Sequence, residues 1–339
     1  MFDVDGTLLL SDRTLGGYEV LPGAIEVLTA LGERGFPFVL LTNGSNYPPA
    51  EQAARLRNSG LPVADTQMIT PSSVAADHLS RRGIGRVLVL GTRGVGHALE
   101  EAGMATLYTG EPGASEVDAV YVGWHPQCGM RDIETAAHAI WNGARLFSAS
   151  DVPFFATRQG RTIGYSFAIV GAIRRLTRAP VTVLGKPSLH ALRFVAKRLG
   201  TRMAHVGVVG DDPIVETLMA RRGGATALAV TTGMTSGAEW LRQPHSRRPH
   251  RILGELSELL ELVYCSPPAP AARRKVSGAR PNRRRKRRAK WLGSVKPQRA
   301  ATSITGASRR RASANRSRPR CRRACIGSSL KLLPAAANA

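Results

Sequence analysis

The stretch Met1-Phe2-Asp3-Val4-Asp5-Gly6-Thr7-Leu8 opens the chain and sets two carboxylates one residue apart. Asp3 and Asp5 alternate with hydrophobic residues, which is the period of a strand whose carboxylates share one face. Gly6 permits a sharp turn, and Thr7 can hydrogen-bond back into that turn. Two acids this close can act as an ionised nucleophile and a protonated acid, where a cation and the local environment separate their pKa values. The alternative is a plain strand end that runs into an Asp-Gly turn.

Charge divides the chain into two parts of different character. The whole chain has 48 Lys and Arg against 24 Asp and Glu, a net charge of +24, which alone favours nucleic-acid binding. Residues 265–339 contain 22 of these basic residues and no Asp or Glu, which leaves 26 basic and all 24 acidic residues to positions 1–264. The first part therefore has an ordinary globular composition and is long enough for one large domain, or for a core with an insertion.

Hydropathy and cysteine content narrow the class of protein. No stretch of the chain reaches 18 uninterrupted apolar residues, and its start lacks a basic and apolar signal pattern. We therefore expect a cytoplasmic protein without a membrane span. The four cysteines, Cys128, Cys265, Cys321 and Cys325, indicate neither a disulfide framework nor a metal site.

Short apolar runs alternate with amphipathic stretches over positions 1–264. This alternation predicts an α/β fold, in which a parallel sheet has helices on both faces. Ligands of such sheets bind beyond the carboxyl ends of the strands. The predicted strands are Met1 to Val4, Phe36 to Leu41, Arg86 to Leu90, Ala119 to Val122, Val181 to Leu184, Ala204 to Val209 and Ala225 to Thr231; helical spacing recurs at 24–31 and 189–199.

Three further polar motifs follow predicted strands. Thr42-Asn43-Gly44-Ser45 offers a hydroxyl, an amide and a flexible backbone to phosphate oxygens. Gly185-Lys186-Pro187-Ser188 supplies an ammonium that can neutralise phosphate charge. Gly210-Asp211-Asp212-Pro213, with Glu216 a turn further on, is an acidic pocket of the kind that magnesium prefers. Each motif alone is typical of a turn, a helix start or a surface loop, but four in order after apolar strands are much more specific.

In this order the four motifs resemble those of the haloacid dehalogenase-like hydrolases, whose phosphatases carry an Asp-x-Asp-Gly-Thr signature. The stretch between Thr42 and Lys186 is similar to the cap inserted in the class IIA branch, which includes p-nitrophenylphosphatase-like, phosphoglycolate phosphatase-like and nucleotide phosphatase-like enzymes. The resemblance covers roughly residues 1–263. It implies a Rossmann-like parallel-sheet core of residues 1–70 and 186–263, an inserted α/β cap domain of residues 71–185, and a basic tail of residues 264–339.

The resemblance also implies a phosphatase reaction. Asp3 would attack phosphorus to form an aspartyl-phosphate, and Asp5 would protonate the leaving oxygen and then activate the hydrolytic water. Mg²⁺ would be held by the Asp3 carboxylate, the Asp5 backbone carbonyl and Asp211. Lys186 would stabilise both the nucleophile and the transferring group.

The second motif supplies the phosphate site that the resemblance implies. Thr42 and the backbone of Asn43 and Gly44 would bind the phosphoryl oxygens. The implied substrate is a small phosphorylated metabolite, because the cap of this class covers the site and restricts entry. A homo-oligomer formed through the cap is a further expectation.

The chain departs from the branch at two places in the core. Glu216 stands where the branch usually has an aspartate, and Asp212 stands where a neutral residue is common, so either side chain could support the metal. Only Met1 and Phe2 precede Asp3, whereas the first strand of the family has several apolar residues before the nucleophile. We therefore expect the native start to lie upstream.

Two turns of the predicted cap are expected to face the core. They are Gly123-Trp124-His125-Pro126 and Ser150-Asp151-Val152-Pro153, and His125 stands where relatives often have Asp. A packed Trp124 and a merely exposed His125 are the alternative.

The tail carries a second hypothesis about function. Its arginine-rich runs, such as residues 283–288, and its lack of acidic residues predict disorder and nonspecific, salt-dependent binding to nucleic acid. A catalytically weak or inactive protein of this family, tethered to nucleic acid by its tail, is therefore the alternative function. The composition of the tail also fits an out-of-frame translation of GC-rich sequence, which would give it no function.

Overall fold

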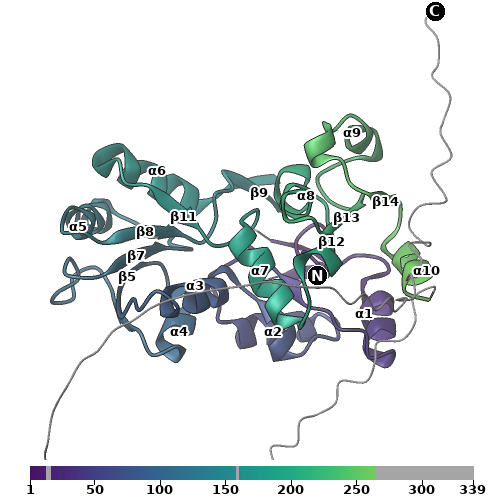
Figure 1. Ribbon diagram of the computed structural model, residues 1–339, viewed down its shortest axis with the longest axis horizontal. Coiled ribbons are helices and arrows are strands. Elements are labelled where there is room, and N and C mark those ends of the chain that lie inside the picture. The colour runs from purple at the N-terminus through teal and green to yellow at the C-terminus, as the bar shows by residue number, and fades with distance from the viewer. Residues whose placement is uncertain (13–16, 158–159, 265–339) are drawn as a thin grey trace, which may run out of the picture. The chain divides into compact units, whose positions relative to one another are not determined.

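The computed structural model describes residues 1–12, 17–157 and 160–264 (Figure 1). A parallel sheet is built from the two ends of this chain. β3 (Leu40–Leu41) pairs with β4 (Met68–Ile69), and β12 (Gly207–Gly210) pairs with β13 (Thr226–Val230), which pairs with β14 (Arg251–Leu253). Phe2 joins the two halves through parallel bridges to Leu40 and Val209. The opening run therefore lies in the middle of the core sheet, and its carboxylates are placed at the carboxyl edge.

The predicted first strand, Met1 to Val4, is reduced to single bridges. The N–H of Phe2 donates to the carbonyl of Val39, and the N–H of Asp3 donates to the carbonyl of Val209, both at 2.9 Å. In return, the N–H of Leu41 donates to the carbonyl of Phe2 at 2.9 Å and the N–H of Val209 donates to that of Met1 at 3.0 Å, and the pairing with these two strands ends after Asp3. Phe36 to Leu41 is likewise regular only at β3, and the 3₁₀ turn Met203–His205 occupies part of the run predicted as strand Ala204 to Val209.

Helices cover both faces of the core sheet. α1 (Ala24–Glu33) buries Ala24, Val27, Leu28 and Leu31, the spacing that the sequence predicts. These side chains pack with Phe2 and Leu40 in one hydrophobic cluster. The other helices of this part are α2 (Pro49–Asn58), α7 (Leu189–Arg198), α8 (Leu218–Gly223), α9 (Gly237–Leu241) and α10 (Leu259–Tyr264), with short turns of 3₁₀ helix at Asp65–Gln67, His245–Arg247 and Leu256–Glu258 and of π-helix at Pro213–Thr217.

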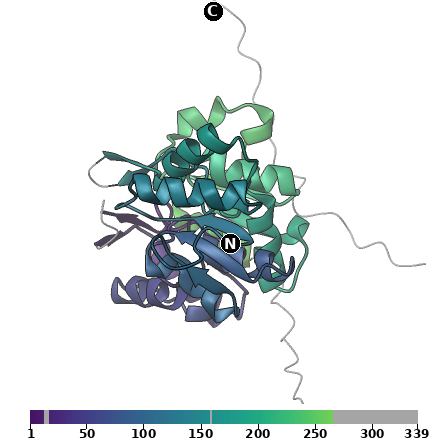
Figure 2. The same ribbon diagram turned by 90° about the vertical axis from the view of Figure 1, so that its left-hand side faces the viewer.

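A second parallel sheet comes from the middle of the chain. Its strands are β5 (Arg86–Leu90), β6 (Ala105–Leu107), β7 (Ala119–Val122), β8 (Arg145–Ser148) and β11 (Val181–Val183), in the order β11-β8-β7-β5-β6. Val87 and Val89 pack into one hydrophobic cluster and Leu88 and Leu90 into another, as alternation along a strand requires. α3 (Pro71–Ser80) and α4 (Arg93–Glu101) lie on one side of this sheet, and α5 (Met130–Trp141) and α6 (Tyr165–Thr177) on the other (Figures 1 and 2).

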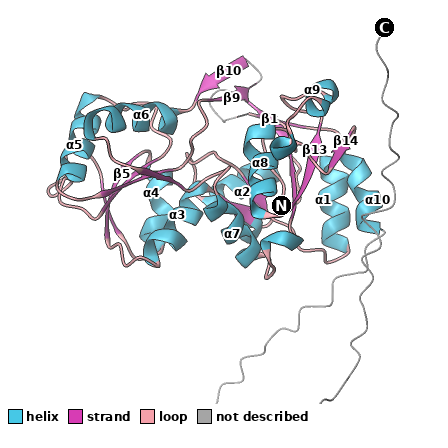
Figure 3. Cartoon of the chain, turned by 45° about the horizontal axis from the view of Figure 1, so that its top comes forward, coloured by secondary structure: helices cyan, strands magenta, loops and turns pink. Residues whose placement is uncertain are grey.

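Two antiparallel hairpins accompany the sheets. β1 (Leu9–Ser11) pairs with β2 (Tyr18–Val20), and β9 (Phe154–Thr157) pairs with β10 (Gly160–Ile163). Figure 3 shows β9 and β10 outside both parallel sheets. The sequence predicted neither hairpin.

The observed architecture confirms the predicted α/β fold with an inserted α/β unit. The strands of the second sheet all lie between residues 86 and 183, within the chain that separates β4 from β12. The exact boundaries at 70/71 and 185/186 stay a prediction. Within the described ranges no helix is long and apolar enough to cross a membrane. The predicted tail lies outside the described residues except for Tyr264, the last residue of α10.

Candidate active site

The four sequence motifs meet in one pocket with a cavity volume of about 130 Å³. Asp3 and Asp5 follow the central bridge, Thr42 follows β3 and Asp211 follows β12, all at the carboxyl edge of the core sheet. Lys186 comes after β11, the edge strand of the second sheet, and extends into the core. The pocket lining includes every residue predicted for catalysis, phosphate binding or metal binding: Asp3, Asp5, Thr42, Asn43, Gly44, Lys186 and Asp211.

A buried ion-paired cluster forms the centre of the pocket. The ammonium of Lys186 pairs with Oδ1 of Asp3 and lies 2.7 Å from Oε1 of Glu216. All three residues are 5% exposed or less. Burial lowers the pKa of Lys186, but the carboxylates of Asp3 and Glu216 outweigh it and raise the pKa above the usual range for lysine. Burial raises the pKa of Glu216, against the opposing effect of Lys186. The lysine therefore holds its charge at the centre of the pocket.

Asp211 occupies a space that two glycines leave open. A Cβ atom at Gly6 would lie 2.4 Å from Oδ2 of Asp211, and one at Gly233 would lie 2.0 Å from it. Gly6 also has a φ of 84°, a conformation that favours glycine. The N–H of Met234 donates to the same Oδ2 at 2.9 Å. Burial and then the charge of Asp3 raise the pKa of Asp211 to about 7, so this carboxylate lies in an excess of negative charge.

Asp5 has the environment of a proton donor. Burial is the main cause that raises the pKa of Asp5 to about 6. The hydroxyl of Ser11 donates to Oδ1 of Asp5 and lowers this pKa, whereas the charge of Asp3 raises it further. The hydroxyl of Thr7 donates to Oδ2 of Asp3 at 3.4 Å, as the turn geometry predicts. Two acids separated by one residue thus have different partners, which is how one fold assigns different roles to two carboxyls. Ser11 was missed in the sequence because its position in an unpredicted hairpin gave no signal.

The side chain of Asn43 positions the segment that carries Lys186. Its Oδ1 accepts from the N–H of Lys186 at 2.8 Å, and its Nδ2 donates to the carbonyl of the same residue at 3.0 Å. Nδ2 also donates to Oγ of Ser150 at 3.3 Å. A Cβ atom at Gly185 would lie 2.6 Å from the same Oδ1, so the close approach requires glycine. The hydroxyl of Thr42 accepts from the N–H of Gly44 at 2.9 Å and shapes the adjacent loop.

The acidic motif divides its carboxylates between two tasks. Oδ1 of Asp212 accepts from the N–H of Ile214 at 2.7 Å and caps the helical turn that follows. Glu216 instead faces Asp3 and Asp211, and one oxygen of each of these three lies within 4.8 Å of the others. A Cβ atom at Gly210 would lie 2.3 Å from Cγ of Glu216, so glycine makes room for the longer side chain.

These donors fit a hard divalent cation. Among the described residues that line the pocket, the single cationic side chain of Lys186 faces the carboxylates of Asp3, Asp5, Asp211, Asp212 and Glu216. Mg²⁺ is bound in proteins by carboxylate and carbonyl oxygens, and a divalent ion would compensate the remaining negative charge. Asp3, Asp211 and Glu216 are the side chains whose oxygens are close enough together to share it.

The outer wall of the pocket comes from the inserted unit. The rings of Trp124 and Tyr165 pack edge to face with their centroids 4.7 Å apart, and both line the pocket. The N–H of Trp124 donates to Oγ of Ser45 at 3.0 Å, which ties this turn to the core. Both turns expected to face the core reach the pocket, through Trp124 and through Ser150. His125 pairs instead with Asp132 on α5.

Comparisons with known proteins agree with this architecture. A family model described as haloacid dehalogenase-like hydrolase matches residues 1–105, and one described as HAD-hydrolase-like matches residues 183–259. The chain is 27% identical over 236 residues to the 5′-nucleotidase YutF of Bacillus subtilis (strain 168), a match that covers 69% of this chain and 87% of that protein. It is also 27% identical over 239 residues to the ribonucleotide monophosphatase NagD of Escherichia coli (strain K12), with the same two coverages.

A solved structure shows the same arrangement of elements. The glycerol phosphate phosphatase of Mycobacterium tuberculosis in complex with magnesium superposes with a TM-score of 0.67 at 27% identity, over 76% of this chain and 75% of that one. The fold and the site thus define a hydrolase with a parallel α/β core, a carboxylate cluster at the carboxyl edge of its sheet and an inserted α/β unit. The chain belongs to the haloacid dehalogenase-like hydrolases, in the branch with the class IIA cap.

Proposed function

We propose that this hydrolase is a magnesium-dependent phosphatase that cleaves a small phosphate monoester through an aspartyl-phosphate intermediate. The observation that carries the proposal is the buried cluster in which Asp3 is paired with Lys186 beside Asp211 and Glu216, with the protonatable Asp5 two residues away. A nucleophile, a proton donor and a fixed cation are the groups that this displacement needs.

The reaction follows from the two acids. An oxygen of Asp3 forms a bond to phosphorus while the bond to the leaving oxygen breaks, and Asp5 gives its proton to that oxygen. Asp5 then takes a proton from a water molecule that attacks the aspartyl-phosphate, which releases phosphate and restores Asp3. Throughout, Lys186 offsets the negative charge that gathers on Asp3 and the phosphoryl oxygens.

Asp3, Asp211 and Glu216 would hold the metal ion, together with the backbone carbonyl of Asp5. When bound, Mg²⁺ supplies positive charge that reduces the repulsion between an anionic nucleophile and an anionic substrate. Thr42 and the backbone of Asn43 and Gly44 would bind the phosphoryl oxygens. The hydrogen bonds of the Asn43 side chain to Lys186 leave its backbone for that role.

The pocket supports a small substrate. The cavity of about 130 Å³ lies between the carboxylates and the rings of Trp124 and Tyr165, which would contact the leaving group. Relatives are named for small phosphate esters: a 5′-nucleotidase, a dihydroxyacetone phosphatase and a glycerol phosphate phosphatase. A small phosphorylated metabolite with an alcohol or phenol leaving group is therefore the proposed substrate class.

Turnover and trapping together test the proposal. The purified full chain should release p-nitrophenol from p-nitrophenyl phosphate with Mg²⁺, and chelation should abolish the release until Mg²⁺ is added back. Acid quenching during turnover of a ³²P-labelled monoester should trap hydroxylamine-sensitive label on the wild-type protein but not on Asp3→Asn. Turnover that survives chelation would contradict the metal requirement, and label that persists on Asp3→Asn would contradict the nucleophile.

Other expectations from the sequence stay predictions. Nucleic-acid binding by residues 264–339 concerns a segment that lies outside the described residues apart from Tyr264. The cytoplasmic location and a homo-oligomer formed through the cap are likewise untested. Magnesium-dependent turnover would exclude the alternative that this is an inactive member of the family, and a chain ending at residue 264 would separate turnover from nucleic-acid retention.

A further inference from the structure

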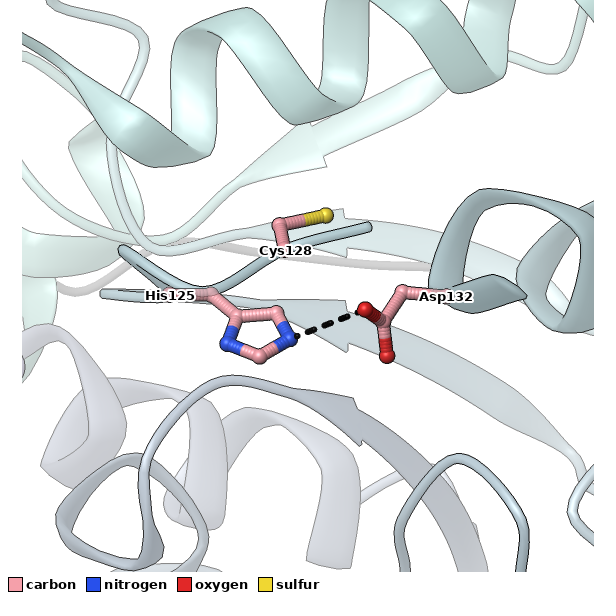
Figure 4. Close-up of side chains that lie close together, drawn as sticks. All are labelled: His125, Cys128 and Asp132. Carbon is pink, nitrogen blue, oxygen red and sulfur yellow. Dashed lines mark ion pairs between the residues drawn. The ribbon is translucent and has the colours of Figure 1, made fainter. Parts of the chain in front are cut away.

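A cluster of three different metal-ligating groups lies in the inserted unit, apart from the carboxylates of the pocket. His125 and Cys128 belong to the loop between β7 and α5, and Asp132 is in the first turn of α5 (Figure 4). Nε2 of His125 lies 3.4 Å from Oδ2 of Asp132. One nitrogen, the sulfur and one carboxylate oxygen all lie within 4.8 Å of one another. None of the three residues is among those that line the pocket.

The backbone holds these groups together without any ion. The N–H of Cys128 donates to the carbonyl of His125 at 3.2 Å, which closes a turn between the two residues. The N–H of Gly129 donates to Oδ2 of Asp132 at 2.8 Å, so the helix start is fixed against the end of that turn. The three side chains are half-buried, which limits competition from water while leaving a path for an ion. The cluster is therefore pre-organised.

We propose that His125, Cys128 and Asp132 bind a divalent transition-metal ion of the zinc type, with water as a fourth ligand. An imidazole nitrogen, a thiolate and a carboxylate form a mixed N, S, O donor set that suits Zn²⁺ and not Mg²⁺. Zinc bonds of about 2.0 Å to nitrogen and oxygen and about 2.3 Å to sulfur place such tetrahedral ligands about 3.3 to 3.5 Å apart. Small side-chain rotations would bring the observed separations, at most 4.8 Å, into that range.

The position of the cluster connects it to the pocket. His125 directly follows Trp124, which lines the pocket, and the carbonyl of Trp124 accepts from the N–H of Thr92 at 3.0 Å. An ion bound at the cluster would fix the loop from its outer end, while Ser45 and Thr92 hold it at the inner end. The site is thus placed to stiffen the pocket wall that, in the proposed function, would contact the leaving group.

Cobalt spectroscopy of the full chain tests the site without any measurement of activity. With excess Mg²⁺ present to occupy the carboxylate cluster, Co²⁺ should give a thiolate charge-transfer band in the near ultraviolet, and Zn²⁺ should remove it with a stoichiometry of one. Cys128→Ser should abolish the band, and His125→Gln should weaken Zn²⁺ binding by at least about tenfold. The band should remain in two controls: the triple variant Cys265→Ser, Cys321→Ser, Cys325→Ser, and His138→Gln on α5.

Each opposite result would overturn the proposal. A folded wild-type chain without the band has no thiolate ligand at this site. A band that persists in Cys128→Ser, or that disappears in the triple variant, would place the metal on the other cysteines. Circular dichroism shows whether Cys128→Ser folds. If it does not fold, His125→Gln is the deciding variant, because unchanged Zn²⁺ affinity in that variant would show that His125 is not a ligand and would overturn the proposal.

Discussion

The two sheets of this protein differ in the chemistry that they present to the same pocket. Among the described lining residues, the core contributes the carboxylates of Asp3, Asp5, Asp211, Asp212 and Glu216, whereas the inserted unit contributes uncharged side chains such as Trp124, Ser150 and Tyr165. Lys186, where the chain returns from the second sheet to the core, is the exception. In the proposed reaction this difference separates two tasks, because the buried charges would act on phosphorus while the neutral rings would contact the variable part of the substrate.

The largest effect on activity should come from substitution of the proposed nucleophile, Asp3, in the core. Asp3→Asn removes the proposed nucleophile and should lower kcat for p-nitrophenyl phosphate by about 10⁴-fold or more. Asp65→Asn makes the same chemical change at a surface ion pair with Arg57 and should leave kcat unchanged. Steady-state kinetics of both variants give the comparison. Activity near the wild-type value in Asp3→Asn would contradict the proposal that the core carboxylates carry out the chemical step.

Loss of the buried cation should come next. Lys186→Met keeps the volume but leaves Asp3 and Glu216 without their ammonium, so kcat/KM should fall by about 10³-fold. Lys197→Met removes a lysine that is 65% exposed and paired with Asp77, and it should change kcat/KM less than twofold. Rates close to those of the wild type in Lys186→Met would show that the charge of this lysine is dispensable for the reaction.

The sequence predicted the parts of the site that depend on local pattern. Asp3, Thr42 and Asp211 each follow an apolar run, and parallel strands bring the ends of such runs to one edge. Helix α1 was equally readable, because its buried side chains recur at the helical period. Local periodicity is a property of the sequence itself, and therefore it can be recognised without knowledge of the fold.

The parts that the sequence did not reveal depend on contacts between distant residues. The hydrogen bonds of the Asn43 side chain join residues 143 positions apart, and nothing near Asn43 in the sequence indicates the partner. The different roles of Asp212 and Glu216 are likewise hidden in the sequence, because only the fold shows that Asp212 caps a helical turn while Glu216 lies beside Asp3 and Asp211. Cys128 gave no metal signal alone, because its partners His125 and Asp132 are ordinary residues until the turn brings them together.

Acid should destabilise the packing between the inserted unit and the core around His78. His78 of α3 is 2% exposed and packs between Phe147 of β8 and His190 of α7. Burial, with the nearby His190 and Arg82, lowers the pKa of His78 to about 4. The unfolded chain therefore binds this proton first as pH falls, and the contribution of His78 to the unfolding free energy should drop by at most about 3 kcal/mol between pH 6.5 and pH 4. Denaturant melts across this range measure it.

A matched variant isolates the contribution of His78. His78→Leu should flatten the dependence of unfolding free energy on pH over that range, whereas His97→Leu, at a 45% exposed side chain, should not. If the unfolding free energy depends on pH equally in the wild type and in His78→Leu, protonation of His78 does not contribute to acid destabilisation.

A smaller effect distinguishes the two carboxylates of the acidic motif. Glu216→Gln removes one charge from the set that includes Asp3 and Asp211, so the concentration of Mg²⁺ at half-maximal activity should rise about tenfold. Asp212→Asn should leave it unchanged, because asparagine caps a helix about as well as aspartate does. Titration of activity with Mg²⁺ measures both, and the reverse pattern would assign the metal to Asp212.

The smallest effect should come from the neutral wall, and its kinetic form is diagnostic. Trp124→Ala removes a ring that faces the pocket but lies on the inserted unit, so KM for p-nitrophenyl phosphate should rise about three- to tenfold with kcat nearly unchanged. Trp141→Ala, at a 60% exposed position on α5, is the control and should alter neither constant. A fall in kcat at constant KM would mean that the ring acts on the chemical step, and selection and chemistry would then share the same wall.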